Sequence, residues 1–409
     1  RQEEEGATLC RKLDYQELTP CLIEITAVWE KMLSSQQREV DEDGMEKQET
    51  DKENTVSPDE LLECVKKGVP RSLRGQIWLF LIQQRQQMGG SASDNSYSDA
   101  NYDDLLKQLT THQHAILIDL GRTFPNHPYF STPLGPGQLE LFNLLKAYSL
   151  LDTEVGYCQG LSFIVGVLLM HMEEISAFHV LKYLMYGLGL RKQFRPNMTA
   201  LQLKLYQLTR LLHDHYKDVY DHFEAHEISP TLYAAPWFLT LFASQFPLGF
   251  VARVFDMVFV QGIDALFKVA LMLIGNHRAL ILQCDTFESI VDFLKITLPE
   301  MVQVQMERII NQAFELDVER ELRAYEVEYY VLSEEITFSS TRQHQQQQQQ
   351  QQQIQKQDTG TTTEARFPRI EKRRMSIDLE MLYRLENQNR ALKNQNQELV
   401  EKLQVRMFC

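Results

Sequence analysis

The apolar residues between Asp103 and Glu334 recur at helical spacing in one segment after another, and the alternating pattern of a half-buried strand is almost absent. Turn-forming residues separate these segments, which number about a dozen: Pro125, Gly135-Pro136-Gly137, Gly160, Pro196, Pro230, Pro247, Gly262 and Pro299. Since 44% of the 409 residues are hydrophobic, the chain can bury one large core or two smaller ones. We therefore predict an all-α fold.

Local signals predict two helices ahead of this region. Ser57 is followed by a proline and, three residues on, by Glu60, which combines an N-cap serine with a capping-box glutamate. The helix that begins there should end at Gly68 and Pro70. The next helix should direct four side chains into the core: Ile77, Trp78, Leu81 and Ile82.

The flanking segments are less regular. An amphipathic helix is predicted over residues 11–35, where six apolar residues fall near one side: Leu22, Ile23, Ile25, Val28, Trp29 and Leu33. Residues 40–60 hold nine acidic side chains against two lysines, which predicts a linker. Residues 89–101, rich in Gly, Ser, Asp and Asn, predict a loop.

The bulk properties exclude several classes. A formal net charge of −15 argues against a nucleic-acid partner. The six cysteines contain no C-x-x-C pair, which favours a reduced, cytosolic protein and argues against zinc. No stretch holds the roughly 20 consecutive apolar residues of a membrane span. The chain opens at Arg1 and stops at Cys409 within a helical pattern, so we expect it to be part of a longer protein.

The C-terminal part changes character. Residues 337–372 lose hydrophobic periodicity and include the run Gln345–Gln353, which predicts a disordered spacer. A heptad pattern follows at Leu382, Asn389, Asn396 and Leu403, and at Leu385, Leu392 and Leu399. This pattern favours the start of a parallel two-stranded coiled coil that forms a homodimer through residues 376–405. The alternative is one solvated amphipathic helix.

Two short motifs carry the strongest functional signal. In Ile116-Leu117-Ile118-Asp119-Leu120-Gly121-Arg122, helical spacing places Ile116, Asp119 and Arg122 on one face. In Tyr157-Cys158-Gln159, the flanking glycines favour a turn that presents the carboxamide outward. Phosphoryl transfer from GTP needs an arginine against the growing phosphate charge and a glutamine that orients the attacking water. The chain has no G-x-x-x-x-G-K-[ST] loop for a nucleotide of its own, which indicates catalysis in trans.

These motifs, in this order and about 35 residues apart, resemble those of TBC-domain Rab GTPase-activating proteins. Further stretches fit the same family: Gly68-Val69-Pro70, Arg74-Gly75-Gln76-Ile77-Trp78, Ser229-Pro230-Thr231-Leu232-Tyr233 and Pro236-Trp237-Phe238-Leu239-Thr240-Leu241-Phe242. Residues 143–159 and 228–261 look most similar to the Akt-substrate subfamily, which restrains glucose-transporter vesicles until insulin signalling relieves it. At Phe255-Asp256 the chain departs from the family's common Trp-Asp, but phenylalanine keeps an aromatic side chain there.

The resemblance implies a multi-helix domain and an activity. Arg122 matches the family's arginine finger, and Gln159 matches the glutamine finger that replaces the Rab's own glutamine in holding the water. From the residues alone, Arg122 would be taken for a surface arginine near a helix C-terminus. For Gln159 the residues leave open the alternative of a buried glutamine bonded to backbone. No cofactor of the chain's own is expected, because Mg²⁺ and GTP come with the Rab partner. The family also implies a cytoplasmic protein that associates with vesicle membranes through Rabs and regulates vesicle trafficking.

Four more residues are expected to support or orient these two. Asp119 should orient the Arg122 guanidinium by a charge-assisted hydrogen bond; the alternative is a surface ion pair worth a few tenths of a kcal/mol. We expect Trp78 to lie in the core. We expect Tyr157 to shape the loop that holds Gln159. Arg74 is either a structural ion-pair partner or a Rab-facing cation, and the sequence does not choose.

Two weaker signals remain. Arg373-Arg374-Met375-Ser376 makes Ser376 a candidate phosphorylation site for a basophilic kinase, with chance occurrence as the alternative. Eight histidines have spacings that suit helix faces better than a chelate, so no metal is expected: His112, His114, His171, His179, His213, His215, His222 and His226.

The predicted organisation is a helical lead-in with an acidic linker (residues 1–57), a TBC Rab-GAP domain (58–336), a Gln-rich linker (337–372) and the start of a coiled coil (373–409). A non-catalytic Rab-binding dimeric scaffold is the alternative function. The presence of both fingers favours the activator, since a scaffold needs neither. A helical-repeat adaptor would require a fixed sequence period, and we find none.

Overall fold

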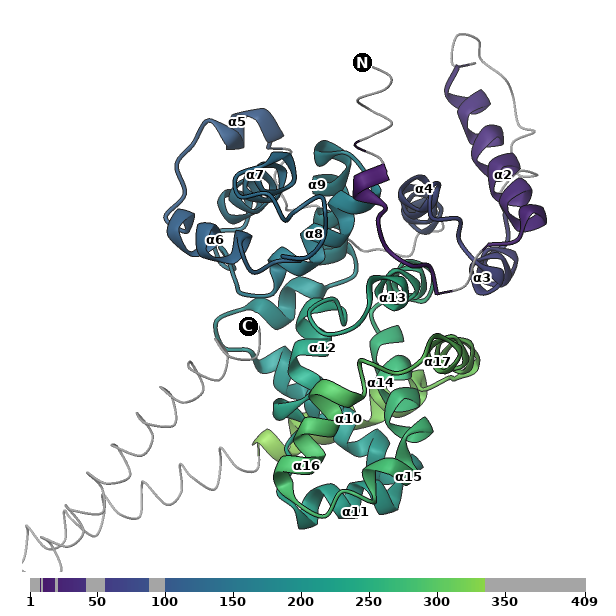
Figure 1. Ribbon diagram of the computed structural model, residues 1–409, viewed down its shortest axis with the longest axis vertical. Helices are drawn as coiled ribbons and strands as arrows, with labels where there is room; N and C mark the ends of the chain where they lie inside the picture. The colour runs from purple at the N-terminus through teal and green to yellow at the C-terminus, as the bar shows by residue number, and fades with distance from the viewer. Residues whose placement is uncertain (1–7, 9, 19–20, 42–55, 88–99, 335–409) are drawn as a thin grey trace, which may run out of the picture. The chain divides into compact units, whose positions relative to one another are not determined.

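The computed structural model describes residues 8, 10–18, 21–41, 56–87 and 100–334, without the side chains of 35–41. It divides into compact units at residues 1–326 and 327–409, and the fold described below is that of the first unit. All regular structure in the described residues is helical, and no strand occurs among them, which confirms the predicted all-α fold (Figure 1). The Gln-rich linker, the heptads and the predicted loop at 89–101 lie wholly or largely outside the described residues.

One group of helices precedes residue 195 and forms the upper part of Figure 1. Its members are α2 (Ile23–Asp41), α3 (Pro58–Lys67), α4 (Arg74–Gln87), α5 (Tyr102–Leu106), α6 (Gln113–Leu120), α7 (Pro136–Leu151), α8 (Leu161–His171), α9 (Glu174–Lys182), the π-helix η1 (Tyr183–Gly187) and the 3₁₀-helix η2 (Leu190–Phe194).

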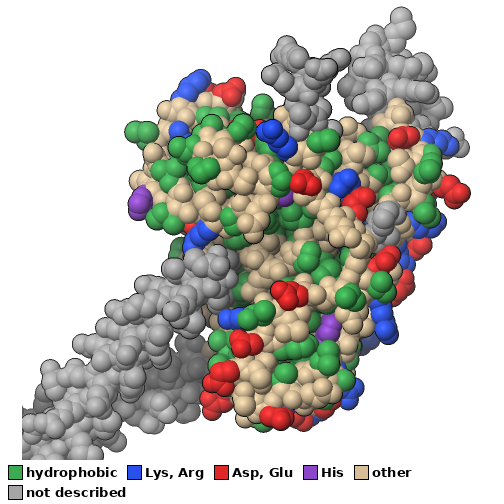
Figure 2. All heavy atoms as spheres, viewed as in Figure 1, with side chains coloured by type: hydrophobic (Ala, Val, Ile, Leu, Met, Phe, Trp, Pro, Cys, Tyr) green, Lys and Arg blue, Asp and Glu red, His purple; other side chains and the backbone are tan. Residues whose placement is uncertain are grey.

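A second group lies below it in the same view. It consists of α10 (Thr199–His215), α11 (Lys217–Ala225), η3 (Pro230–Leu232), α12 (Ala234–Thr240), α13 (Leu248–Gln261), α14 (Ala265–Asn276), α15 (Arg278–Ile281), α16 (Phe287–Asp292), η4 (Phe293–Thr297) and α17 (Gln303–Glu315). The chain is helical again over residues 319–334. On the face drawn in Figure 2, Lys and Arg side chains lie singly among acidic ones.

The helices predicted from local signals form where expected. Ser57 caps α3, and its side chain accepts a hydrogen bond from the Glu60 backbone N–H at 3.2 Å. Gly68 ends the helix with φ of +134°, a conformation that side chains rarely adopt. In α4, Trp78 is fully buried and its ring stacks on that of Phe255, with centroids 5.5 Å apart. Phenylalanine therefore fills the aromatic position as expected.

A buried carboxylate joins α4 to α13. Asp256 is fully buried, and its Oδ1 accepts hydrogen bonds from Arg74 Nε (3.1 Å) and Trp78 Nε1 (2.8 Å). Its Oδ2 accepts from Arg253 Nη1 at 3.0 Å. Removing one partner of such a buried pair leaves an uncompensated charge in the core and is strongly destabilising. The two helices are thus fixed to each other by one ionic cluster.

The helix predicted over residues 11–35 is wrong in its first half. The backbone leaves the helical conformation at Leu13, and α2 begins only at Ile23. The Arg71 guanidinium donates to the carbonyl oxygens of Leu13 (3.0 Å) and Tyr15 (2.7 Å). A helix would use such carbonyls internally, so a tertiary contact competes with local helix propensity and prevails.

The predicted apolar side of α2 is only partly buried. Trp29 is fully buried, and its Nε1 donates to the Gly68 carbonyl oxygen at 2.9 Å. Leu22 and Ile23, by contrast, are exposed. The lead-in segment therefore packs on the domain through Trp29 rather than through a continuous apolar stripe.

Residues 12–18, here called the strap, connect the two groups of helices. Lys12 Nζ donates to Glu140 of α7 at 3.2 Å. Gln303 of α17 donates through Nε2 to the Glu17 carbonyl oxygen at 2.9 Å. Figure 1 shows this purple segment running from beside α8 and α9 down to α13. The strap therefore ties the upper group to the lower one.

The strap also completes a polar chain at the end of α8. His171 Nδ1 lies 2.8 Å from the Val167 carbonyl oxygen, and its Nε2 lies 2.8 Å from Tyr15 Oη. Since a carbonyl accepts only, Nδ1 carries the proton and Tyr15 donates to Nε2. Arg74 Nη1 in turn donates to Tyr15 Oη at 2.6 Å. Burial and the Arg74 charge lower the pKa of His171 to about 3.

We predict that Gly249→Ala destabilises the protein. A Cβ at this position in α13 would lie 2.2 Å from the Gln16 carbonyl oxygen and 2.9 Å from the Leu18 backbone nitrogen, both in the strap. Overpacking of this kind costs about 1–3 kcal/mol. Because both clashing atoms are backbone and cannot rotate away, we expect a cost above the roughly 1 kcal/mol that alanine gains over glycine in a helix. Thermal unfolding should show a melting temperature several degrees lower.

Gly121→Ala is the matched control, because its Cβ would meet nothing within 4 Å and its backbone is already helical. Equal melting temperatures for Gly249→Ala and wild type would contradict the close packing of the strap.

We predict a pH dependence of stability from His171. Its pKa is lower in the folded chain than its ordinary 6.5, so the unfolded chain takes up a proton first as the pH falls. The free energy of unfolding should decline below about pH 6.5, at up to about 1.4 kcal/mol per pH unit. Urea unfolding between pH 7 and 5 should show this slope, and His171→Gln should reduce it. The variant of the exposed His114, His114→Gln, should keep the wild-type slope; loss of the slope there instead would exclude His171 as its source.

Candidate functional site

The end of α6 presents Arg122. The helix ends at Leu120, and Ile116 and Asp119 on its inner face are buried. Arg122 follows one residue after the C-cap and turns back, so that its Nη2 lies 2.5 Å from Asp119 Oδ1. About a fifth of the Arg122 side chain (21%) stays exposed, against 5% for Asp119. A buried carboxylate thus holds a guanidinium at the surface.

Tyr157 reaches the same carboxylate from a different segment. Its hydroxyl donates a short hydrogen bond to Asp119 Oδ2. Burial, and then the Asp119 charge, raise the pKa of Tyr157 well above its ordinary value, so the phenol keeps its proton and remains a donor. Thr123 Oγ1 lies 2.7 Å from the Asp119 carbonyl oxygen and 2.8 Å from Ser162 Oγ, which ties the end of α6 to α8.

Gln159 lies two residues after Tyr157 in a turn that needs glycine at two positions. Gly156 has φ of +61° and Gly160 has φ of +102°, conformations that favour glycine. A Cβ at Gly156 would also lie 2.4 Å from His112 Nε2, so the turn approaches α6 closely there. Gln159 itself is partly exposed. The structure therefore brings Arg122, Asp119, Tyr157 and the turn that carries Gln159 together around one carboxylate.

The other expected supporting residues lie elsewhere. Arg74 is 2% exposed and Trp78 fully buried, and both belong to the ionic cluster around Asp256. Burial fits the structural alternative for Arg74 rather than a cation that faces a partner. Ser376 lies outside the described residues.

Two residues at this site were missed by sequence reasoning. Asp152, at the C-cap of α7, is 2% exposed, and its carboxylate accepts hydrogen bonds from Arg191 Nε (2.5 Å) and Nη2 (2.8 Å). Burial acts to raise the pKa of Asp152, but the hydrogen bonds from Arg191 and Tyr148 outweigh it and hold the pKa below its ordinary value. Asp152 and Arg191 are 39 residues apart and form no local motif, so spacing carries no signal.

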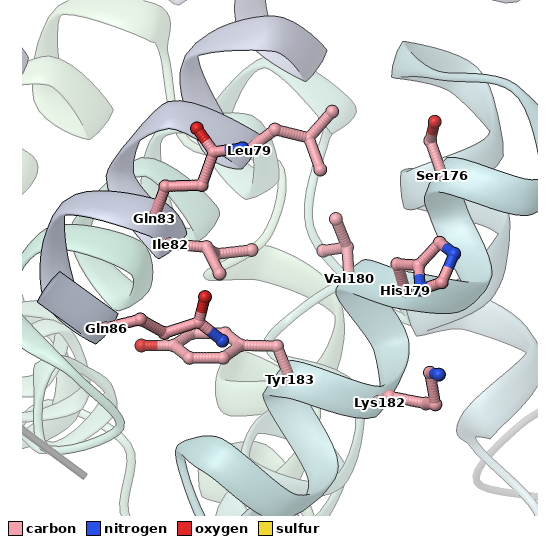
Figure 3. Close-up of a pocket in the computed structure, with 9 residues that line it drawn as sticks. All are labelled: Leu79, Ile82, Gln83, Gln86, Ser176, His179, Val180, Lys182 and Tyr183. Carbon is pink, nitrogen blue, oxygen red and sulfur yellow. The ribbon is translucent and has the colours of Figure 1, made fainter. Parts of the chain in front are cut away.

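The predicted finger residues lie outside the groove that runs between α4 and the end of α9. This groove has a volume of about 320 Å³ (Figure 3). The residues that line it are Leu79, Ile82, Gln83, Gln86, Ser176, His179, Val180, Lys182 and Tyr183. Within the described residues no group of three or more His, Cys, Asp or Glu side chains is arranged to hold a metal ion. No described helix is both long and apolar enough to cross a membrane.

Fold and site together describe an all-α domain that holds an arginine and a glutamine-bearing turn on one buried carboxylate. The family model described as the Rab-GTPase-TBC domain matches residues 71–282, more than half of the chain. The protein belongs to the family of TBC-domain Rab GTPase-activating proteins.

Curated relatives agree with this assignment. The chain is 53% identical to human TBC1 domain family member 1 and 51% identical to mouse TBC1 domain family member 4, in each case over 96% of its length. It spans only 30% and 26% of those two relatives. These similarities fit the Akt-substrate subfamily.

Solved structures share the fold. The TBC domain of a Chlamydomonas flagellar RabGAP superposes with a TM-score of 0.51 at 24% identity, covering 71% of this chain and 93% of that one. The Ypt/Rab-GAP domain of Gyp1p gives 0.52 at 18% identity, covering 64% and 94%. At these identities the likeness concerns the fold alone.

Proposed function

We propose that this chain accelerates GTP hydrolysis by Rab small GTPases and supplies Arg122 and Gln159 in trans. One observation carries the proposal: the Asp119 carboxylate forms an ion pair with Arg122 through Oδ1 and accepts a hydrogen bond from Tyr157 on Oδ2. The segments that bear the arginine and the glutamine are thereby fixed to a single group. Preorganisation of this kind is what charge stabilisation in a transition state requires.

Arg122 is the charge-neutralising group in this proposal. Nη2 forms the ion pair with Asp119, and a guanidinium has five N–H donors in a planar fork. The remaining donors face the γ-phosphate of the bound Rab. Charge grows on the phosphate oxygens as the bond to the bridging oxygen of GDP breaks, and an arginine finger is worth about 10³–10⁵ in rate.

Gln159 orients the nucleophile. A carboxamide both accepts and donates hydrogen bonds, so it can hold a water in line with the γ-phosphorus. The water oxygen forms the new bond to phosphorus, GDP leaves, and the water protons end on phosphate and solvent. Mg²⁺ and GTP belong to the Rab, and this chain contributes side chains alone.

The wider role follows from the family. A Caenorhabditis elegans relative, 36% identical over 68% of this chain, is named Rab GTPase-activating protein tbc-11. The chain spans less than a third of the length of human TBC1 domain family member 1. Its Rab substrate and its association with vesicle membranes are therefore part of the proposal. Homodimerisation through residues 376–405 is a further part, outside the described residues.

We predict that single-turnover GTP hydrolysis by a panel of purified Rabs identifies the substrate. The full 409-residue chain should accelerate hydrolysis by a few Rabs, and Arg122→Lys and Gln159→Ala should each reduce that acceleration by about 10²-fold or more. Lysine keeps the charge but loses the planar fork.

Matched controls are Arg278→Lys, whose Nε pairs with Asp218 at 2.6 Å far from α6 in the chain, and Gln202→Ala on the exposed side of α10. Both should keep wild-type rates, and thermal melts should show all variants folded. Binding to Rab–GTP without acceleration of any Rab would overturn the activator and leave the scaffold.

We predict that Asp119→Asn lowers the acceleration by about tenfold or more, because the neutral amide weakens the charge-assisted bond that orients Arg122. Asp104→Asn is the matched control: Asp104 also pairs with a residue three positions on, Lys107, at 2.7 Å, but both are exposed. Full activity of Asp119→Asn in the same assay would refute the orienting role.

A further inference from the structure

The turn that carries Gln159 has a second support besides Asp119. Asp152 begins this turn, and its carboxylate accepts from Arg191 through two parallel hydrogen bonds, Nε to Oδ2 at 2.5 Å and Nη2 to Oδ1 at 2.8 Å. Such bidentate pairs fix geometry as well as charge. Arg191 comes from η2, a short 3₁₀-helix beyond α8 and α9 in the chain.

Asp152 in turn sets the backbone of the turn. Its Oδ1 accepts from the Val155 backbone N–H at 3.2 Å, and its carbonyl oxygen accepts from the Gly156 N–H at 2.7 Å. Tyr148 Oη donates to Oδ2 at 2.9 Å. The first half of the turn is therefore built on one carboxylate whose charge Arg191 balances.

The same 3₁₀-helix contacts the second half of the turn. Cys158 Sγ, adjacent to Gln159, donates to the Phe194 carbonyl oxygen at 3.4 Å. Gln193 is fully buried, and its Nε2 donates to the Phe238 carbonyl oxygen of α12 at 2.9 Å. Through η2 the turn is thus anchored to the second group of helices.

Two weaker ion pairs, both to Glu154, lie beside this anchor. Arg191 Nη2 lies 2.5 Å from Glu154 Oε2, and Arg195 Nε lies 3.1 Å from Glu154 Oε1. The Glu154 side chain is half exposed, so solvent screens these contacts, whereas Asp152 is buried. The pair of Arg191 with Asp152 is the one that holds the turn.

We propose that Arg191 is a positioning residue for Gln159: through Asp152 it fixes the turn that presents the carboxamide, and so sets the rate of hydrolysis without touching the nucleotide. This inference rests on the proposed Rab-activating function. Arg191 then supports the turn through Asp152, in addition to the contact of Tyr157 with Asp119.

A double-mutant cycle in single-turnover GTP hydrolysis tests the proposal, with the full chain and a responsive Rab. Arg191→Lys keeps the charge but breaks the two-point geometry. At saturating concentrations of the chain, we expect the maximal rate of GTP hydrolysis to be about tenfold lower than with wild type. The concentration of chain that gives half of this rate should stay within about twofold of the wild-type value. On a Gln159→Ala background the substitution should have no further effect, whereas on an Arg122→Lys background the two losses should multiply.

Hydrogen exchange of the chain alone supplies a readout that needs no Rab. Arg191→Lys should speed exchange of the 153–160 amides about tenfold and leave residues 113–120 unchanged. Arg278→Lys, which changes another arginine–aspartate pair, should do neither. Faster exchange throughout the chain would mean general destabilisation and overturn the proposal.

Three kinetic outcomes are distinguishable. The positioning role is supported if Arg191→Lys lowers the maximal rate in the wild-type chain and in the Arg122→Lys variant but not in the Gln159→Ala variant. An equal further loss on the Gln159→Ala background, or a wild-type maximal rate for Arg191→Lys, overturns it while the proposed function stands. No acceleration by the wild-type chain on any Rab overturns both.

Discussion

The fold depends on one buried ionic cluster, centred on the Asp256 carboxylate. Taking a carboxylate out of water is costly unless its charge and lone pairs are satisfied. Arg74 and Arg253 balance it, and the Trp78 indole N–H fills a further position. Because these donors come from different helices, the cluster forms only when α4 and α13 pack in one relative position. Apolar contacts drive the burial, and the ionic cluster selects one packing among many.

The candidate site uses the same physics near the surface. Asp119 and Asp152 are both nearly buried carboxylates, each paired with an arginine and with a tyrosine hydroxyl. Each joins segments that are distant in the sequence. Rigidity at the proposed fingers therefore comes from charge pairs in a region of low dielectric, where hydrogen bonds are stronger than in water.

Local signals in the sequence predicted much of the fold and part of the site. The cap at Ser57, the helix end at Gly68 and the inward face with Trp78 depend on neighbours within a few residues, which spacing records. The ion pair of Asp152 with Arg191 and the non-helical backbone at Leu13 depend on partners 39 and 58 residues away. No periodicity encodes such contacts, so they became visible only in the structure.

The strap makes the order of synthesis matter for this domain. Gln16 and Gln303 lie 287 residues apart, yet their side chains are hydrogen bonded at 3.0 Å. The strap is synthesised well before α17, which carries one of its docking sites. Contacts of such high sequence separation form late and slowly. During synthesis the strap therefore stays undocked until α17 has been made. In that interval it is accessible to chaperones and proteases.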